Sequence, residues 1–478
     1  MRKILNIILT VMLLFMIHPE SLRADGGYTI TIPSTINTNT NQTINYSVDD
    51  NYMLDVSVTS TNGNKVKNGS NAISYTPSAT SWNELSGSGS FTYKATTSGT
   101  PSVAGTYTDT LTFNLHSEAL AVPFYIEAVE ATTITLSKKG SPTVGTAKYG
   151  INTTSPSTSY TYGNSISLTA GQKCYWTITS TTTAFSISKY LYFTSTGKIK
   201  AGGNLSSLIG GNTSVPRNYC FAYLFNGCTN LIDASDINFG SITSFNSKTY
   251  AFANMFQDCT SLTAAPELPA TALANYCYDN MFRNCTGLTT APKLPATTLA
   301  KYCYDFMFYG CTSLTTAPEL PATTLVNYCY YAMFRNCTGL TTAPKLPATT
   351  LASDCYAYMF QDCTSLTTAP KLPATTLASD CYRSMFYGCT RLTSAPALPA
   401  TTLASGCYAY MFYGCSKIKL SATRTGTYTK AYRIPTSGTG TDASSTMIYM
   451  FTNTGGTFTG APTINTTYYL DSSNSVVQ

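Results

Sequence analysis

The sequence has few charged residues, and none of them gather in a basic run. Only 10% of its 478 residues are charged, against about a quarter in an average soluble domain. The surface must therefore be made largely of Thr, Ser, Asn and Tyr, which is typical of β-rich extracellular modules. No Lys/Arg run exceeds two residues, so the net charge of +6 forms no basic patch for nucleic acid. We expect no nucleic-acid partner.

Metal ligands are also scarce. The chain has two histidines, and only His116 lies beyond residues 1–24. No two cysteines lie within four residues of each other, whereas structural zinc sites use closely spaced ligand pairs. We therefore expect no metal site and no cofactor.

The N-terminus has the pattern of an export signal. Arg2 and Lys3 precede an apolar stretch from Ile4 to Ile17, and Leu22-Arg23-Ala24 is a plausible cleavage site. The stretch is short for a bilayer span of about 20 residues. We expect residues 1–24 to be a signal peptide, the protein to be secreted or at the cell surface, and the mature chain to contain no integral membrane span.

Two β modules are predicted next. Short runs of alternating apolar and polar residues, such as Tyr28–Ile32 and Leu54–Val58, indicate half-buried strands. Their number favours an Ig-like β-sandwich over residues 25–130. A weaker β pattern over residues 131–216 predicts a small β module that acts as an N-terminal cap for the remaining chain.

The rest of the chain is dominated by a repeat of 26 residues. Six units run close to L-P-A-T-T-L-A-x-x-C-Y-x-x-M-F-x-x-C-T-x-L-T-x-A-P-x, and they begin at Leu268, Leu294, Leu320, Leu346, Leu372 and Leu398. Degenerate copies precede them around Phe225 and Phe256, and another lies after them around Phe451. We expect a solenoid over residues 217–423, closed by a degenerate capping repeat over 424–478.

Each repeat is expected to contain a helix and a short strand. Leu273, Cys277, Met281, Phe282 and Cys285 recur at intervals of four, which we interpret as one side of a helix. The residue before the second Cys tolerates a left-handed backbone and would end that helix; across eight copies it is Gly227, Asp258, Asn284, Gly310, Asn336, Asp362, Gly388 and Gly414. The prolines after it leave room only for a short strand. The predicted fold class is therefore α+β.

Charges alternate at the position before each L-P. Glu267, Lys293, Glu319 and Lys345 would place opposite charges on neighbouring repeats, followed by Lys371 and Ala397. An exposed pair contributes under about 1 kcal/mol. We interpret this stripe as a solvated aid to repeat register.

Sixteen cysteines in an exported chain raise the question of disulfides. Along a helix the two Cys of one repeat would lie about 12 Å apart, too far to bond. Pairing between neighbouring repeats stays open, and the favoured interpretation is reduced cysteines that act as small core residues.

The M-F-x-x-C-T-x-L core, the L-P after it and the long period resemble the BspA-like leucine-rich-repeat surface proteins. The resemblance covers about half of the chain, and the usual member has a shorter repeat. It implies a solenoid exposed at a bacterial surface that binds host or microbial macromolecules, with no reaction.

Adhesion or binding is therefore the first functional hypothesis, with host extracellular or surface proteins, or glycans, as partners. The residues after M-F vary and are rich in Tyr and Arg, which dominate interaction hot spots. They form the candidate ligand-contact surface: Arg283, Tyr309, Arg335, Gln361, Tyr387 and Tyr413. A variable solvated stripe is the alternative for these residues. For the whole protein the alternatives are a structural spacer and a carbohydrate-active solenoid enzyme. The enzyme is the less favoured alternative, because the acidic residues Asp279, Asp305, Asp354 and Asp380 are not expected to cluster.

Overall fold

The structure is a computed structural model that divides into two compact units, residues 1–122 and 123–478, which are described separately. It describes residues 5–10, 20–24, 28–32, 41–48, 52–60, 64–68, 71–79, 81–85, 88–97, 110–119, 122–179, 185–239, 242, 245, 247–434, 437–438 and 446–478.

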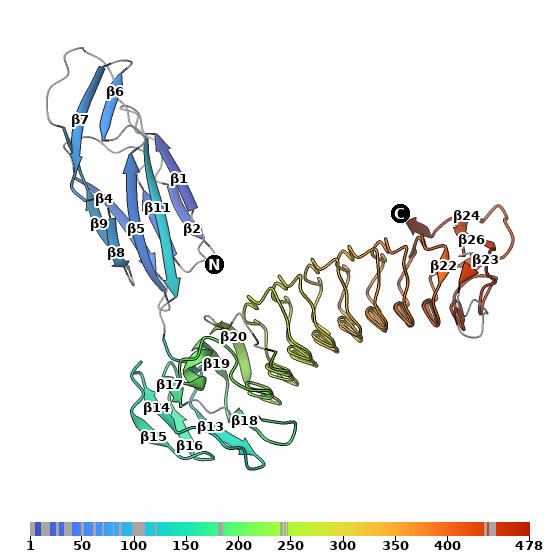
Figure 1. Ribbon diagram of the computed structural model, residues 1–478, viewed down its shortest axis with the longest axis horizontal. Coiled ribbons are helices and arrows are strands. Elements are labelled where there is room, and N and C mark those ends of the chain that lie inside the picture. Colours follow the sequence, from blue (N-terminus) through green and yellow to red (C-terminus); the bar gives the residue numbers. More distant parts are fainter. Residues whose placement is uncertain are drawn as a thin grey trace. The chain divides into compact units, whose positions relative to one another are not determined.

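The first unit is a set of antiparallel strands (Figure 1). Two four-stranded sheets have the orders β1-β11-β5-β8 and β2-β3-β4-β9, and a small sheet has the order β10-β7-β6. Trp82 of β8 stacks on Phe91 of β9 with ring centroids 4.2 Å apart, so the two larger sheets face each other. The strands are β1 (Leu5–Thr10), β2 (Glu20–Ala24), β3 (Tyr28–Ile32), β4 (Gln42–Val48), β5 (Tyr52–Ser60), β6 (Lys65–Asn68), β7 (Asn71–Pro77), β8 (Ser81–Leu85), β9 (Ser88–Tyr93), β10 (Ala95–Thr97) and β11 (Thr110–Ala119).

The predicted run Tyr28–Ile32 coincides with β3, and the predicted run Leu54–Val58 lies within β5. An Ig-like relationship stays a prediction, as does removal of residues 1–24 on export. No helix of the described ranges combines the length and the hydropathy needed to span a membrane.

The second unit begins with two sheets that enclose an aromatic core. A six-stranded sheet has the order β15-β14-β17-β12-β19-β20, and a three-stranded sheet has the order β16-β13-β18. Trp176 of β17 packs edge-on against Phe193 of β18 at 5.4 Å. The strands are β12 (Tyr125–Ala128), β13 (Thr132–Lys139), β14 (Ala147–Ile151), β15 (Thr158–Tyr160), β16 (Ser165–Leu168), β17 (Lys173–Ile178), β18 (Tyr190–Ser195), β19 (Ile199–Asn204) and β20 (Leu231–Asn238).

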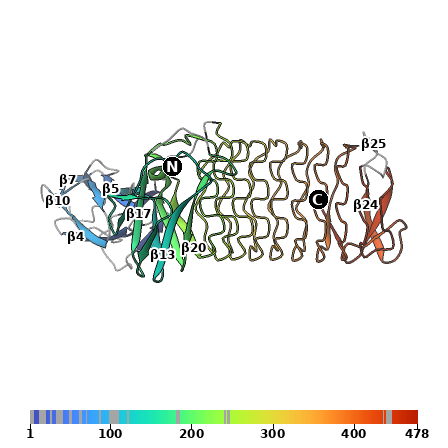
Figure 2. The same cartoon turned by 90° about the horizontal axis from the view of Figure 1, so that it is seen from below.

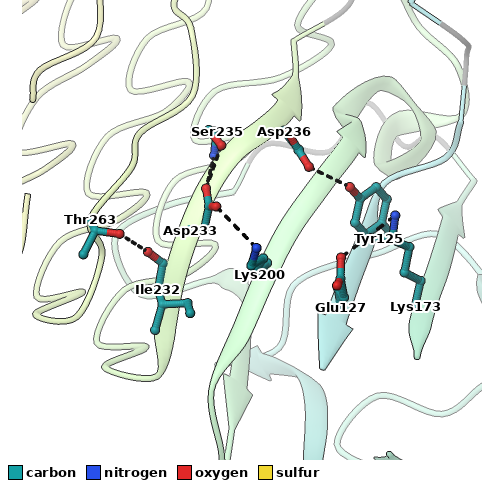
Figure 3. A network of polar contacts seen from close by, with 9 residues as sticks. All are labelled: Tyr125, Glu127, Lys173, Lys200, Ile232, Asp233, Ser235, Asp236 and Thr263. Carbon is teal, nitrogen blue, oxygen red and sulfur yellow. Dashed lines mark hydrogen bonds and ion pairs between the residues drawn. The ribbon is translucent and has the colours of Figure 1, made fainter. Parts of the chain in front are cut away.

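This β module covers the open end of the repeats and shares their core. Strand β20 pairs in parallel with β19, and Phe225 of the first degenerate repeat stacks on Phe193 at 5.5 Å. Figure 3 shows the polar side of the junction, where the Tyr125 hydroxyl donates to Asp236 Oδ2 at 3.2 Å and Thr263 Oγ1 donates to the Ile232 carbonyl at 2.9 Å. The first repeat therefore does not expose its apolar side.

The predicted α+β class is wrong, because the repeats contain no α-helix. The only helical segment in the described part of the chain is a short 3-10 helix, η1 (Leu205–Ile209). Between β20 and the C-terminal strands the chain forms regular coils that lie side by side (Figure 2). The segment predicted as a helix is a run of turns in every one of these coils.

The turns follow one another every four residues and are held by two kinds of hydrogen bond. Met281 N donates to Tyr278 O within the coil at 3.2 Å, whereas Phe282 N donates to Met307 O of the next coil at 2.9 Å. A left-handed residue recurs at each fourth position, with φ of 58° at Tyr276, 54° at Asn280 and 57° at Asn284. The backbone amides are thus satisfied between coils, which makes the repeats cooperative.

This geometry accounts for the mistaken helix. Side chains four apart on an α-helix diverge by about 40°, because each residue turns by about 100°. In the turn segment a spacing of four keeps Cys277, Met281 and Cys285 on one side without drift, and all three are fully buried. The left-handed backbone predicted before the second Cys is confirmed in all eight copies, with φ between 57° and 73°.

The interior of the coils consists of stacked side-chain ladders. Nine phenylalanines stack from Phe225 to Phe451 with centroids 5.4 to 5.8 Å apart. All sixteen cysteines are free and buried. Burial raises the pKa of the Cys329 and Cys337 thiols to about 12, so these thiols are unreactive core groups at neutral pH.

The rest of each coil returns in extended form and pairs sparingly. Single parallel bridges join equivalent residues of consecutive coils, such as Thr316 with Thr342. Short strands close the C-terminal end, where Phe451 of the degenerate copy stacks on Phe412 at 5.4 Å. These strands are β21 (Ser394–Pro396), β22 (Thr402–Leu403), β23 (Leu420–Ser421), β24 (Tyr428–Arg433), β25 (Ser437–Gly438), β26 (Thr467–Asp471) and β27 (Ser475–Val477).

Candidate functional site

The outward side chains of the turn segments form one surface, which we call the turn face. In the coil that contains Met281, two buried residues alternate with two half-buried ones, and in other coils some of the equivalent outward residues are buried as well. The coil that contains Met281 presents Tyr276, then Asp279 and Asn280, then Arg283 and Asn284. Repetition of the coil turns these three positions into three parallel stripes.

The first stripe is a ladder of tyrosines. Tyr219, Tyr250, Tyr276, Tyr302 and Tyr328 stack in order with ring centroids 4.3 to 4.5 Å apart. The ladder ends where Asp354 takes the same position in the next coil. A hydrogen bond to the Asp354 carboxylate, with its negative charge, raises the pKa of Tyr328 to about 12. The ring faces are covered by neighbours, so this stripe presents ring edges and hydroxyl groups.

The second stripe contains two carboxyls in neighbouring coils. Burial raises the pKa of Asp279 to about 7, although the hydrogen bond from Asn280 and the charge of Arg283 both act to lower it. Burial and the nearby Asp279 carboxyl raise the pKa of Asp305 to about 9. The expectation that the acidic residues do not cluster is wrong, because Asp279 acts on Asp305 and Asp380 acts on Asp354.

The third stripe contains the six candidate contact residues, one in each consecutive coil. The Arg283 guanidinium lies 4.8 Å from the centre of the Tyr309 ring, and that of Arg335 lies 5.8 Å from it. Tyr387 stacks on Tyr413 at 4.7 Å. Gln361 between them is only 8% exposed. The structure thus aligns the candidates, with five of them half-buried at the surface.

A depression of about 280 Å³ lies between the second and third stripes. It is lined by Arg335, Tyr358, Gln361, Arg383, Ser384, Tyr387 and Tyr410. Ser384 and Gln361 form the floor of the depression, because they are buried, at 4% and 8% exposure, between larger side chains.

Sequence reasoning missed Tyr358, Arg383, Ser384 and Tyr410 in this site. They belong to the second stripe, which was assigned to a helix and not compared between repeats. Alignment of the units at a period of 26 would have shown that Ser384 lies between Tyr358 and Tyr410 at one repeat position.

Two arginines of the depression are held in different ways. Arg383 Nη1 lies 3.1 Å from Asp380 Oδ1, and its guanidinium also bonds the Tyr358 hydroxyl. Arg335 lies between Tyr309 and Tyr358, 5.8 and 5.9 Å from the two ring centres. The Nε atoms of both arginines are buried without a hydrogen-bond partner. Among the described residues, no three side chains of His, Cys, Asp or Glu lie together in a way that could hold a metal ion.

The coils match the model of one protein family, the BspA type leucine rich repeat region. The family occurs in six copies, with matches over residues 222–367 and 275–419. The search of curated proteins and the search of solved structures each gave no match. The coils that build the turn face, over residues 222–419, are therefore BspA-type leucine-rich repeats.

Proposed function

We propose that the protein is a non-catalytic binding protein that acts outside a bacterial cell, secreted or at the cell surface. The turn face binds host or microbial macromolecules, either proteins or glycans, and so mediates adhesion. The apolar leader from Ile4 to Ile17 and the low content of charge support the location.

One observation carries the binding role. In all six units the inward Met, Phe, Tyr and Cys are identical, whereas the outward positions vary and include Tyr, Arg, Gln, Asp, Asn, Ser, Phe, Ala and Gly. Tyr and Arg, which hot spots favour, are frequent among these variable residues. Their rings and guanidinium groups are already held by neighbours in the ladder, so ordering them on binding costs little entropy.

The depression favours binding over cleavage. General acid and base catalysis on a polysaccharide needs two carboxyl groups at the bond that breaks. The lining contains guanidinium, phenol, amide and hydroxyl groups but no carboxyl group. Incubation with a panel of polysaccharides is expected to release no new reducing ends, and their release would overturn the non-catalytic proposal.

A binding array tests the main proposal. The purified chain is expected to show saturable binding to at least one glycan or matrix protein. Combined replacement of Tyr309, Arg335 and Tyr387 by Ala should weaken that binding more than tenfold, the usual loss at a hot spot. The control variant replaces the exposed residues Glu267, Glu319 and Lys345 by Ala.

Two results would count against this proposal. Unchanged binding by the triple variant would show that the turn face is not the site. Absence of any saturable ligand would instead favour the structural spacer.

A further inference from the structure

We propose that the depression at Ser384 is a subsite for an acidic saccharide, a sugar ring that carries a carboxylate. This inference deepens the proposed function and rests on it, because it names the ligand class that one part of the turn face takes.

The depression is a gap between two tyrosines that flank Ser384 in one row of equivalent positions. Tyr358, Ser384 and Tyr410 occupy the same position in three consecutive coils, with φ of 59°, 52° and 58°. A tyrosine at position 384 would continue the row, but the serine leaves the space beside it open. The gap is therefore a property of the side chain at 384 and not of the backbone.

The size and length of the depression suit a short run of sugar rings. Its volume of about 280 Å³ lies just below the range of about 300 to 1,000 Å³ for enclosed ligand pockets. The lining residues come from four consecutive coils, which at about 4.8 Å per step extend over roughly 14 Å. A short run of sugar rings fits such a trough, whereas a single apolar side chain would leave much of it wet.

The chemistry of the lining matches both sides of a sugar. The rings of Tyr358, Tyr387 and Tyr410 offer apolar contact for the C–H face of a pyranose. The Gln361 carbonyl oxygen and the Ser384 hydroxyl are small polar groups at the floor. The Gln361 amide itself donates to Asp362 Oδ2 at 3.1 Å, which orients that side chain.

The charge of the lining selects a carboxylate. Arg383 is balanced by Asp380, but Arg335 takes part in no ion pair of the described residues. The nearby carboxyls are engaged elsewhere, Asp354 with Tyr328 and Asp362 with Gln361. A planar guanidinium that is fixed between two tyrosine rings can bind a planar carboxylate through two parallel hydrogen bonds.

Three probes test the ligand class at an ionic strength of about 0.15 M, where long-range attraction is screened beyond about 8 Å. They are oligosaccharides of polygalacturonate, alginate and hyaluronate, with carboxyl-reduced polygalacturonate and dextran sulfate for comparison. We expect titration to show saturable binding of at least one carboxylated probe, and binding at least tenfold weaker for the reduced polymer and for dextran sulfate.

Ser384→Tyr is the decisive variant, because the repeat itself tolerates tyrosine at this position. It fills the gap and is expected to weaken binding at least tenfold. Ala332→Tyr makes a similar addition at an equivalent position outside the lining, where φ is 48°, and should bind within twofold of the parent. Arg335→Gln copies the residue at position 361 and should weaken carboxylate binding about tenfold or more.

Several results would overturn the inference. These are equal binding of the reduced polymer or of dextran sulfate, equal losses for Ser384→Tyr and Ala332→Tyr, or no binding of any of the three carboxylated probes. If the chain then still bound a protein or a neutral glycan through the turn face, the acidic-saccharide subsite would be wrong and the proposed function would stand.

Discussion

The two sides of the turn segment follow opposite rules. On the inner side, Phe282 and its equivalents are the same residue in every unit and are fully buried. On the outer side, Arg283 and its equivalents vary between Arg, Tyr and Gln and are mostly half-buried. One backbone conformation thus carries a constant core and a variable surface only one residue apart. Recognition can therefore change without disturbing the stack.

The largest expected effect comes from breaking the inner ladder. Phe334→Ala should lower the free energy of unfolding by about 3 to 5 kcal/mol, because it removes a buried ring and leaves a cavity. The matched outer variant is Tyr309→Ala, which loses a half-exposed ring and should cost much less. Denaturant melts of both variants measure the contrast, and equal shifts would contradict the division into two sides.

The next effect concerns the backbone that separates the two sides. Gly388 has φ of 70°, and a β-branched side chain is strained there by about 1 to 3 kcal/mol. Gly388→Val should therefore lower the melting midpoint clearly. Gly388→Asn is the control, since Asn284 and Asn336 occupy the same position with φ of 57° and 61°. Equal stability of the two variants would argue against the left-handed turn.

The outer side also contains a pH-dependent element. Asp279 and Asp305 have raised pKa values of about 7 and about 9 in the folded chain, against about 3.9 when unfolded. The folded state holds protons that the unfolded state releases. The stabilisation that the two protonated carboxyls give to the folded state is therefore complete below about pH 4, and it is lost as the pH rises through 7 and 9.

Asp279→Asn with Asp305→Asn should remove this pH dependence. Because one pKa unit corresponds to about 1.4 kcal/mol, the parent should lose at least about 1 kcal/mol more than the variant between pH 5 and pH 9. Urea melts across that range measure the difference. Glu267→Gln changes an exposed carboxyl and serves as the control. Parallel curves for parent and double variant would show that the pair does not titrate as described.

Much of the inner side could be predicted from the sequence, and less of the backbone. The stacking of repeats and the burial of Cys277, Met281 and Phe282 follow from the repeat and its apolar positions. The local backbone conformation could not be predicted in this way, because apolar residues spaced by four are also compatible with a helix over so few residues. The left-handed residue at Asn284 was predicted from its type, but Tyr276 at the same φ gave no such indication.

On the outer side, the sequence predicted the contact residues of the third stripe but not the depression beside it. Arg283, Tyr309 and Arg335 were selected because they come directly after M-F, and they do contact one another. The depression needs side chains of two stripes from four coils, and its floor depends on how deeply Ser384 is sunk. Such relations between coils become visible only when the hydrogen bonds that set the stacking are known.

The smallest expected effect is at the exposed charges that precede each L-P. Glu319 and Lys345 lie in neighbouring coils and are both exposed, and the ion pairs of the described residues do not include them. Solvent screens such a pair, so a double-mutant cycle with Glu319→Ala and Lys345→Ala should give a coupling energy below about 0.5 kcal/mol. A coupling above about 1 kcal/mol would mean that surface charge, as well as the inner ladders, fixes the register of the coils.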